Sequence, residues 1–369
     1  MIEDWSCVHG GAFFDAVGDE FDDLTRRTRI VNADVLDAWF PPSPRVLDAL
    51  QTHLPWLLST SPPTDCGGMA RVVARARGVP EDCVLPGAGS SALIYLAFTR
   101  WLSADSHVVL LDPTYGEYRH VLQRMVGCQI TRLMLAREDE YRFDPARLID
   151  AAREKPDLIV LVNPSSPTGQ HIRREELTET LRSLPSETRI WIDETYVDYV
   201  DSDESLEHFA TTRANVVVCK SMSKVYALSG ARAAYLCSNP RELDTLRKFV
   251  PPWAVSLPAQ VAAVAAIQDP GYYAQRYDET RELREVLISE VGALPGIEPL
   301  RGVANFVLCH LDPRGPTAAT VVDSCREHGV FLRDVSSMGT ALGSHVLRIA
   351  VKDADGIHRI VAALRQATT

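Results

Sequence analysis

The chain has 369 residues, of which 46% are hydrophobic and 24% charged, and its formal net charge is −11. This composition is ordinary for a soluble globular protein with a core of one or two domains. The acidic balance and the lack of a long basic run exclude a nucleic-acid-binding protein, because such binding rests on clustered Lys and Arg. No apolar stretch approaches the ~20 residues that span a membrane.

The N-terminal segment and the cysteines favour a cytoplasmic protein. The sequence opens with MIEDWSCVHGG, which is acidic and lacks the basic and apolar regions of a secretory signal. The eight cysteines are scattered and none forms a CxxC pair, so we expect no metal site. In a chain of this size we expect them to be reduced thiols.

The expected elements alternate along the middle of the chain, after an irregular first 40 residues that are rich in aspartate. Apolar runs without alternation are typical of strands buried on both faces. Short strands that alternate with helices predict an α/β protein with a mostly parallel central sheet. The expected strands are 107–112, 129–135, 157–163, 189–193, 215–219 and 233–236, and the expected helices are 89–101, 116–126, 144–153 and 173–183.

The pattern changes after residue 255. A helical region over 257–293 leads to strands near 305–310 and 346–351 and then to a final helix, which indicates a smaller α+β domain. We therefore expect an N-terminal arm over residues 1–40 that joins the small domain, a large domain over 41–270 and the small domain over 271–369.

Polar side chains follow the expected strands at their carboxyl ends, where parallel sheets bind ligands. One strand ends in Asn163, the next ends in Asp193, and a third runs into Ser221, Ser223 and Lys224. Each of these residues has a structural alternative as a cap or a turn former. The group as a whole offers a lysine, a carboxylate and hydrogen-bond donors at one edge of the sheet.

A small-residue turn at 87–91, GAGSS, opens the expected helix 89–101. Free N–H groups at a helix start, together with the helix dipole, form an anion site. Two further residues have structural alternatives to a role in ligand binding. Tyr115 could be a core aromatic residue, and Arg348 could be a surface residue on an alternating strand. Taken together, these groups are what pyridoxal phosphate requires.

The motifs NPSSPTG (163–169), DETYVDY (193–199) and SMSKVYALSGAR (221–232) occur in the order and spacing of one family. The chain resembles a fold type I pyridoxal-phosphate enzyme of the class I/II aminotransferases, and the resemblance covers almost the whole chain. It implies that the large domain binds the cofactor and that Lys224 bonds covalently to the cofactor aldehyde.

The resemblance also assigns roles to the other residues. Asp193 pairs with the pyridinium nitrogen, Asn163 and Tyr196 bind the phenolic oxygen of the ring, and Tyr115 stacks on the ring face. Arg348 binds the substrate α-carboxylate. The residues that hold the cofactor phosphate are Ser221, Ser223 and Arg232, with the backbone at Ala88, Gly89 and Ser90.

Two subfamilies are most similar. DETYVDY and GVFLRD (329–334) are similar to histidinol-phosphate aminotransferase, in which the arginine that matches Arg333 helps to hold the distal phosphate of the substrate. The sequence HGG at 9–11, with PPWAV and ANFVL, is similar to threonine-phosphate decarboxylase, in which the region of His9 lies near the substrate phosphate.

The chain departs from both subfamilies at two places. Where they carry an Asn-rich NxNP stretch, this chain has LDAWFPPSP (36–44), so that Asp37 and Trp39 reshape the mouth of the pocket. Where they carry a tyrosine that reaches the partner's cofactor, this chain has Ser61. We therefore expect Asp37, with Arg348, Arg333 and His9, among the substrate-binding residues.

The expected function is a cytoplasmic, homodimeric aminotransferase for an amino acid with a polar or anionic side chain, with a 2-oxo acid as the expected second substrate. The same residues serve decarboxylation or elimination, because the bond that breaks depends on the pose of the substrate. A catalytically silent cofactor-binding module is a third alternative, but the chain retains Lys224 and carries no DNA-binding segment.

Overall fold

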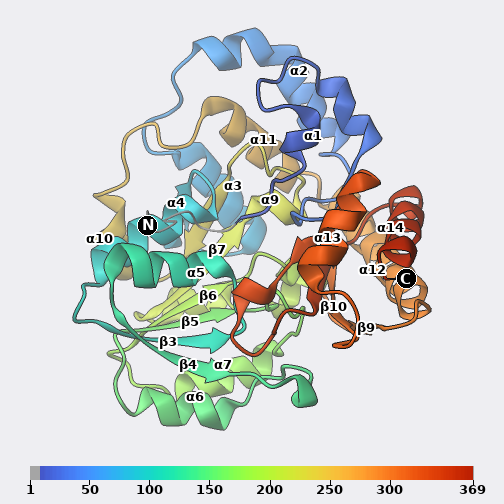
Figure 1. Cartoon of the computed structure of the whole chain (residues 1–369). Coiled ribbons are helices and arrows are strands. Elements are labelled where there is room, and N and C mark those ends of the chain that lie inside the picture. The colour runs from blue at the N-terminus through green and yellow to red at the C-terminus, as the bar shows by residue number, and fades with distance from the viewer. Residues whose placement is uncertain (1–8, 369) are drawn as a thin grey trace.

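The protein, described here from a computed structural model covering residues 9–368, is built on a seven-stranded sheet (Figure 1). The strands lie in the order β2-β8-β7-β6-β5-β3-β4. Those from β7 to β4 are parallel, whereas β8 runs antiparallel to both of its neighbours. The strands are β2 (Val84–Gly87), β3 (His107–Asp112), β4 (Gln129–Met134), β5 (Leu158–Val162), β6 (Arg189–Asp193), β7 (Val216–Ser221) and β8 (Ala234–Cys237). The expected α/β class with a mostly parallel sheet is confirmed.

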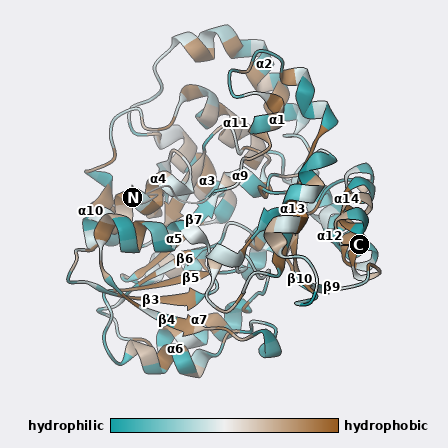
Figure 2. Ribbon diagram, in the orientation of Figure 1, coloured by the Kyte–Doolittle hydropathy of each residue, from teal (hydrophilic) through white to brown (hydrophobic). Residues whose placement is uncertain are grey.

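Helices cover both faces of this sheet, which explains why its strands read as continuous apolar runs. Alternate side chains of β5 divide between two cores: Ile159 and Leu161 join the larger one, and Leu158 and Val160 join the core under α4. Figure 2 shows the hydrophobic strands enclosed between helices with mixed surfaces. The helices of this part are α3 (Gly67–Arg77), α4 (Ser90–Trp101), α5 (Gly116–His120), α6 (Pro145–Ala152), α7 (Arg174–Arg182), α8 (Glu207–Thr212), α9 (Met222–Val225), α10 (Pro240–Arg247) and α11 (Leu257–Ile267).

A second, four-stranded sheet with the order β12-β13-β10-β9 lies in the C-terminal part of the chain. Its strands are antiparallel, and the larger hydrophobic core continues from the first sheet into this one. The elements are α12 (Pro270–Gly292), β9 (Ile297–Leu300), β10 (Phe306–Leu311), α13 (Ala318–Glu327), β11 (Val330–Phe331), β12 (Arg333–Asp334), β13 (Val346–Ala350) and α14 (Ala354–Ala367).

The N-terminal arm attaches to this C-terminal part. Strand β1 (Val31–Asn32) pairs in parallel with β11, and the carbonyl of Ala33 accepts a hydrogen bond from the N–H of Ala350 at 3.1 Å. The described part of the arm also contains α1 (Phe14–Val17), and α2 (Pro44–Ser59) follows it. This attachment carries residues 33–37 between the two sheets.

Short 3₁₀ helices and one π-helical turn complete the described chain. They are η1 (Leu24–Arg29), η2 (Glu81–Cys83), the π-helical η3 (Val121–Val126), η4 (Arg137–Asp139), η5 (Val197–Tyr199), η6 (Ser202–Glu204) and η7 (Ser336–Met338). Within residues 9–368, no helix is long and apolar enough to cross a membrane, and no cluster of His, Cys, Asp or Glu is arranged to hold a metal ion. The seven cysteines in this range are buried free thiols; Cys7 lies outside the described residues.

Candidate active site

A cavity of about 170 Å³ lies at the carboxyl ends of β5, β6 and β7. Its walls come from four sources: the first turn of α4, the start of α5, strands β12 and β13, and the arm. The expected site residues that line it are His9, Ser90, Tyr115, Asp193, Tyr196, Ser221, Ser223, Lys224, Arg232, Arg333 and Arg348. The structure thus brings together most of the residues selected from the sequence.

Lys224 reaches the cavity from α9, the short helix that follows β7. The Ser221 side chain begins this helix by accepting a hydrogen bond from the N–H of Ser223. The Lys224 Nζ lies 3.0 Å from Asp37 Oδ1. Burial lowers the pKa of the Lys224 amine below its usual value, although Asp37 works in the opposite direction. The lowered pKa enlarges the neutral fraction of the amine, which is the nucleophilic form.

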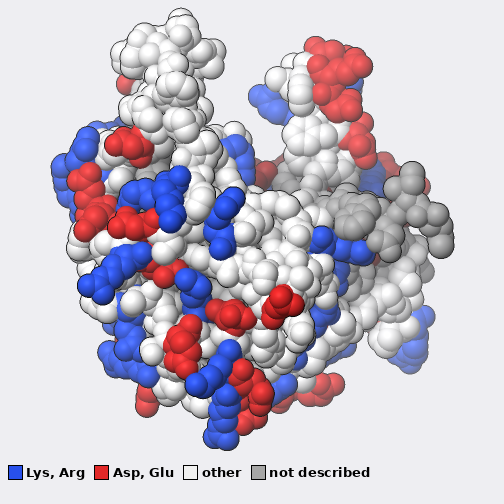
Figure 3. Space-filling model, turned by 90° about the vertical axis from the view of Figure 1, so that its left-hand side faces the viewer, with Lys and Arg blue, Asp and Glu red and all other residues white. Residues whose placement is uncertain are grey.

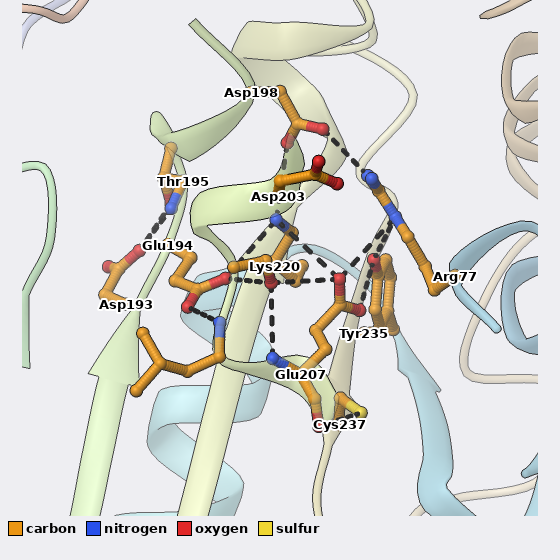
Figure 4. A network of polar contacts seen from close by, with 12 residues as sticks. Arg77, Asp193, Glu194, Thr195, Asp198, Asp203, Glu207, Lys220, Tyr235 and Cys237 are labelled. Atoms are coloured by element: carbon orange, nitrogen blue, oxygen red, sulfur yellow. Dashed lines mark hydrogen bonds and ion pairs between the residues drawn. The ribbon is translucent and has the colours of Figure 1, made fainter. Parts of the chain in front are cut away.

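The other lysine of this segment, Lys220, is locked in a buried ion network (Figure 4). Its Nζ lies 3.3 Å from Asp198, 3.5 Å from Glu194 and 4.0 Å from Glu207, and Arg77 contacts Asp198 at 3.0 Å. Burial tends to lower the pKa of Lys220, but these carboxylates outweigh it and raise the pKa above its usual value. Lys220 therefore stays protonated, which leaves Lys224 as the nucleophilic lysine of the pair.

Asp193 ends β6 and is held by hydrogen bonds on both oxygens. Thr195 donates to Oδ1 through its N–H at 3.0 Å and its hydroxyl at 2.6 Å, and Tyr118 donates to Oδ2 at 2.7 Å. Trp191 in turn donates to the Tyr118 hydroxyl at 2.9 Å. Burial raises the pKa of the Asp193 carboxyl, and the bonds from Thr195 and Tyr118 oppose that shift.

Sequence reasoning missed both partners of Asp193. Thr195 had a local signal, because an aspartate commonly binds the backbone and side chain two residues on. Tyr118 lies 75 positions away in the sequence, so no local pattern links it to Asp193.

The expected phosphate site forms where Gly89 meets Arg232 at the start of α4. Gly89 has a φ of 90°, and an added Cβ would lie 2.5 Å from Arg232 Nη2. A glycine is required here both for the backbone conformation and for the close approach. Arg232 is exposed, and its Nη1 reaches the Ser223 hydroxyl at 3.4 Å. This arrangement leaves a cationic fork over the helix start, which suits an anion.

The aromatic residues of the cavity are Tyr115 and Tyr196. The Tyr115 hydroxyl donates to Glu117 Oε2 at 2.7 Å, and the same oxygen accepts from Ser91 at 2.9 Å. Tyr196 is buried and packs edge-to-face on Phe306. Burial raises the pKa of the Tyr196 hydroxyl well above its usual value, so the hydroxyl remains a hydrogen-bond donor at neutral pH.

Arg348 is buried in β13, which rejects the alternative of a surface residue. Its Nη1 donates to Ser166 Oγ at 3.0 Å and its Nη2 to the carbonyl of Asp34 at 3.3 Å. Its Nε has no hydrogen-bond partner within the described part of the chain. Burial lowers the pKa of the Arg348 guanidinium, and an anion in the cavity would compensate for its lost hydration.

Four expected residues do not line the cavity. The Asn163 side chain is buried, and its amide exchanges two 2.8 Å hydrogen bonds with the backbone of Ile172 instead of facing the cavity. Ala88 and Gly89 lie beside the cavity in the turn before α4. Asp37 contacts Lys224 itself, through Oδ1 at 3.0 Å from Nζ.

The described residues fit pyridoxal phosphate. At Gly89 the backbone lies so close to Arg232 that a single added Cβ would fill the space between them. Lys224, whose pKa is lowered, lines the cavity, and the buried carboxylate of Asp193 lies at the end of β6. The buried Nε of Arg348, which has no partner within residues 9–368, adds a position for a second anion. Phosphate, aldehyde, ring nitrogen and substrate carboxylate each have a matching group here.

Comparison with known proteins agrees with this geometry. Residues 70–364 match the family described as "Aminotransferase class I and II". A histidinol-phosphate aminotransferase of Rhodopseudomonas palustris (strain BisA53) is 28% identical over 331 residues, which cover 89% of this chain and 88% of that protein. Another from Moorella thermoacetica is 29% identical over 269 residues, covering 72% of this chain and 68% of the relative.

Solved structures show the same fold. The histidinol-phosphate aminotransferase of Sinorhizobium meliloti, in complex with pyridoxal-5'-phosphate, superposes with a TM-score of 0.83 at 24% identity over 92% of both chains. The L-threonine-O-3-phosphate decarboxylase of Porphyromonas gingivalis gives a TM-score of 0.80 at 22% identity, over 91% of this chain and 99% of that one.

Proposed function

The chain belongs to the class I and II aminotransferases, which are pyridoxal-phosphate enzymes, and from this we propose that it transfers the amino group of an amino acid with a polar side chain. The observation that carries the proposal is the position of Lys224. It is the lysine in the cavity with a lowered pKa, and it shares that cavity with Asp193, Arg232 and Arg348.

The bound cofactor supplies an aldehyde that takes up the substrate amine and a pyridinium ring that accepts the electron pair released at Cα. Asp193 holds the proton on the ring nitrogen, because its carboxylate is kept in place by Thr195 and Tyr118. Arg232 binds the phosphate and thereby fixes the ring in the cavity.

Arg348 binds the α-carboxylate of the substrate and orients Cα toward Lys224. The Lys224 amine would then act as the base that takes the proton from Cα, and in its protonated form it would act as the acid that gives a proton back before water releases the 2-oxo acid. Asp37, at 3.0 Å, stabilises Lys224 when it carries this proton.

Decarboxylation is the second candidate, and the arm favours it. His9 lines the cavity, and its ring centroid lies 6.1 Å from that of Tyr115. This position supports the second candidate, because the resemblance to threonine-phosphate decarboxylase implies that the region of His9 lies near the substrate phosphate. Decarboxylation requires the α-carboxylate to rotate away from the ring plane, and hence a weaker hold by Arg348.

We also propose a homodimer and a cytoplasmic location. Buried free thiols suit a reducing compartment.

Product analysis tests the reaction type. The enzyme loaded with pyridoxal phosphate is incubated with a panel of amino acids, with and without 2-oxo acids, and the products are identified by mass spectrometry. Transamination gives the 2-oxo acid of the first substrate together with a new amino acid. Release of carbon dioxide with the amine retained would instead establish the decarboxylase.

Peptide mapping tests the lysine independently of turnover. Borohydride reduction of the loaded enzyme should attach the cofactor to Lys224, and Lys224→Ala should yield no labelled peptide. A label on Lys220 would contradict the assignment.

A further inference from the structure

Two arginines face each other across the second sheet beside the cavity. In the β12–β13 register Arg333 lies directly opposite Arg348, and both side chains are buried. Like charges at such a position repel each other, and a buried cation is costly without a counter-charge. A carboxylate near this pair is therefore required before any substrate binds.

Asp34 meets this need, but for only one of the two arginines. Its carboxylate lies 3.5 Å from Arg333 Nη1, and its side chain is only 4% exposed. Toward Arg348 it presents its main-chain carbonyl, at 3.3 Å. Within residues 9–368, Arg348 has no carboxylate within ion-pair distance, so its charge is left for the substrate.

The Asp34 carboxylate is fixed in this position by the arm. The N–H of Gly11 donates to Asp34 Oδ2 at 2.7 Å. Gly10 packs so closely that an added Cβ would lie 2.5 Å from Val35 and 2.7 Å from Asp34 Oδ1. The carboxylate therefore cannot turn away from Arg333 while the arm stays in place.

We propose that the Asp34–Arg333 ion pair makes the distal part of the substrate site electrically neutral, so that the enzyme selects amino acids whose side chain ends in an uncharged hydrogen-bonding group. The inference rests on the proposed function and specifies its substrate class. The charge of Arg333 is already compensated by Asp34, and a neutral tail brings no charge that needs a partner. A phosphate or carboxylate tail meets a cation that is already paired with Asp34, and the buried Glu117 adds a further carboxyl group to the lining of the same cavity.

Binding to the loaded enzyme tests this without turnover. Dissociation constants are measured by calorimetry and from the visible absorbance of the cofactor, for two matched pairs of amino acids. These are L-glutamine with L-glutamate and L-homoserine with O-phospho-L-homoserine. We expect the neutral member of each pair to bind at least ~10-fold more tightly.

Two variants change the preference in opposite directions. Asp34→Asn keeps the shape of the side chain and leaves the charge of Arg333 without its carboxylate. The affinity for glutamate should therefore rise at least ~10-fold relative to the affinity for glutamine. Arg333→Gln leaves the negative charge of Asp34 uncompensated, so the affinity for glutamate relative to glutamine should fall by a similar factor. Asp323→Asn is the control, because it removes an exposed carboxylate from α13 in the same part of the molecule.

The outcomes separate this inference from the proposed function. Tighter binding of the anionic members by the unmodified enzyme, or an unchanged ratio in both variants, overturns the selectivity while the function stands. If no amino acid alters the absorbance or gives heat, the proposed function fails and this inference fails with it.

Discussion

At the scale of single residues, Asp193 is a site group whose side chain is held in position by the protein itself. Three hydrogen bonds hold its two oxygens before any ligand is present. Asp193→Asn keeps the shape but cannot hold a proton on the ring nitrogen, so kcat should fall by roughly 100-fold or more. The melting temperature should change little. Comparable turnover at saturating cofactor would refute the role.

Tyr118 is predicted to act through Asp193. Its hydroxyl donates to a charged group, and such bonds contribute about 1.5–3 kcal/mol, so Tyr118→Phe should lower kcat at least ~10-fold and leave KM unchanged. Tyr141→Phe is a matched control, since Tyr141 is also buried and, within residues 9–368, its hydroxyl bonds only to His310. An equal effect of both variants on kcat would indicate a general effect on packing.

Asp37 should set the pH at which Lys224 reacts. The carboxylate favours the protonated amine, so Asp37→Asn should lower the pKa of Lys224 further, and more of the amine is then neutral at a given pH. The pH midpoint for recombination of the cofactor-free enzyme with pyridoxal phosphate should move to lower pH by roughly one unit. The rate is followed by absorbance. A midpoint that stays in place or moves upward would contradict the contact.

At the scale of elements, the sequence predicted the parallel strands of the central sheet better than it predicted the edge strand β2. Strands β3 and β6 have the expected bounds, because both are continuous apolar runs. Strand β2, which contains Pro86, was not among the expected strands. β2 is an edge strand, where proline is tolerated.

The same division applies to the site. Residues within one motif, such as Ser221, Ser223 and Lys224, were identified because their spacing is local. The contacts of Asp34 with Arg333 and Arg348 depend on an arm that pairs some 300 residues along the chain. Burial strongly affects the charge state of ionisable side chains. Because burial arises only when distant segments pack together, the sequence pattern did not predict these contacts.

The turn between β2 and α4 permits a direct test of the phosphate site. Gly89→Ala places a methyl group against Arg232 and strains a backbone with a φ of 90°. The dissociation constant for pyridoxal phosphate should rise at least ~10-fold, as measured by equilibrium dialysis. Gly271→Ala is the control, because nothing lies within 4 Å of its added methyl group. Equal affinity in both variants would remove Gly89 from the site.

At the scale of the whole molecule, we expect the second copy of the proposed homodimer to bind where apolar side chains contact solvent. Leu54, Trp56 and Leu58 of α2 are 45%, 57% and 71% exposed, and Trp253 is 56% exposed. The face in Figure 3 carries an uncharged knob at its top, the end at which α2 lies in Figure 1. Exposed apolar area of this kind commonly marks an interface.

We therefore predict that the double variant Trp56→Asp/Leu58→Asp sediments as a monomer while the unmodified protein sediments as a dimer. Val286→Asp is the control, because Val286 is 46% exposed on α12, away from this end of the molecule. A dimer that survives the double change would place the interface elsewhere.

The attachment of the arm has a practical consequence for handling the protein. Since His9 lines the cavity and Gly10 packs on Asp34, a purification tag fused at the N-terminus is tethered close to the site. The opposite end of the chain leaves through α14, which ends at Ala367 on the far side of the second sheet (Figure 1). A C-terminal tag keeps affinity handles, cleavage scars and surface-immobilisation chemistry away from the cavity.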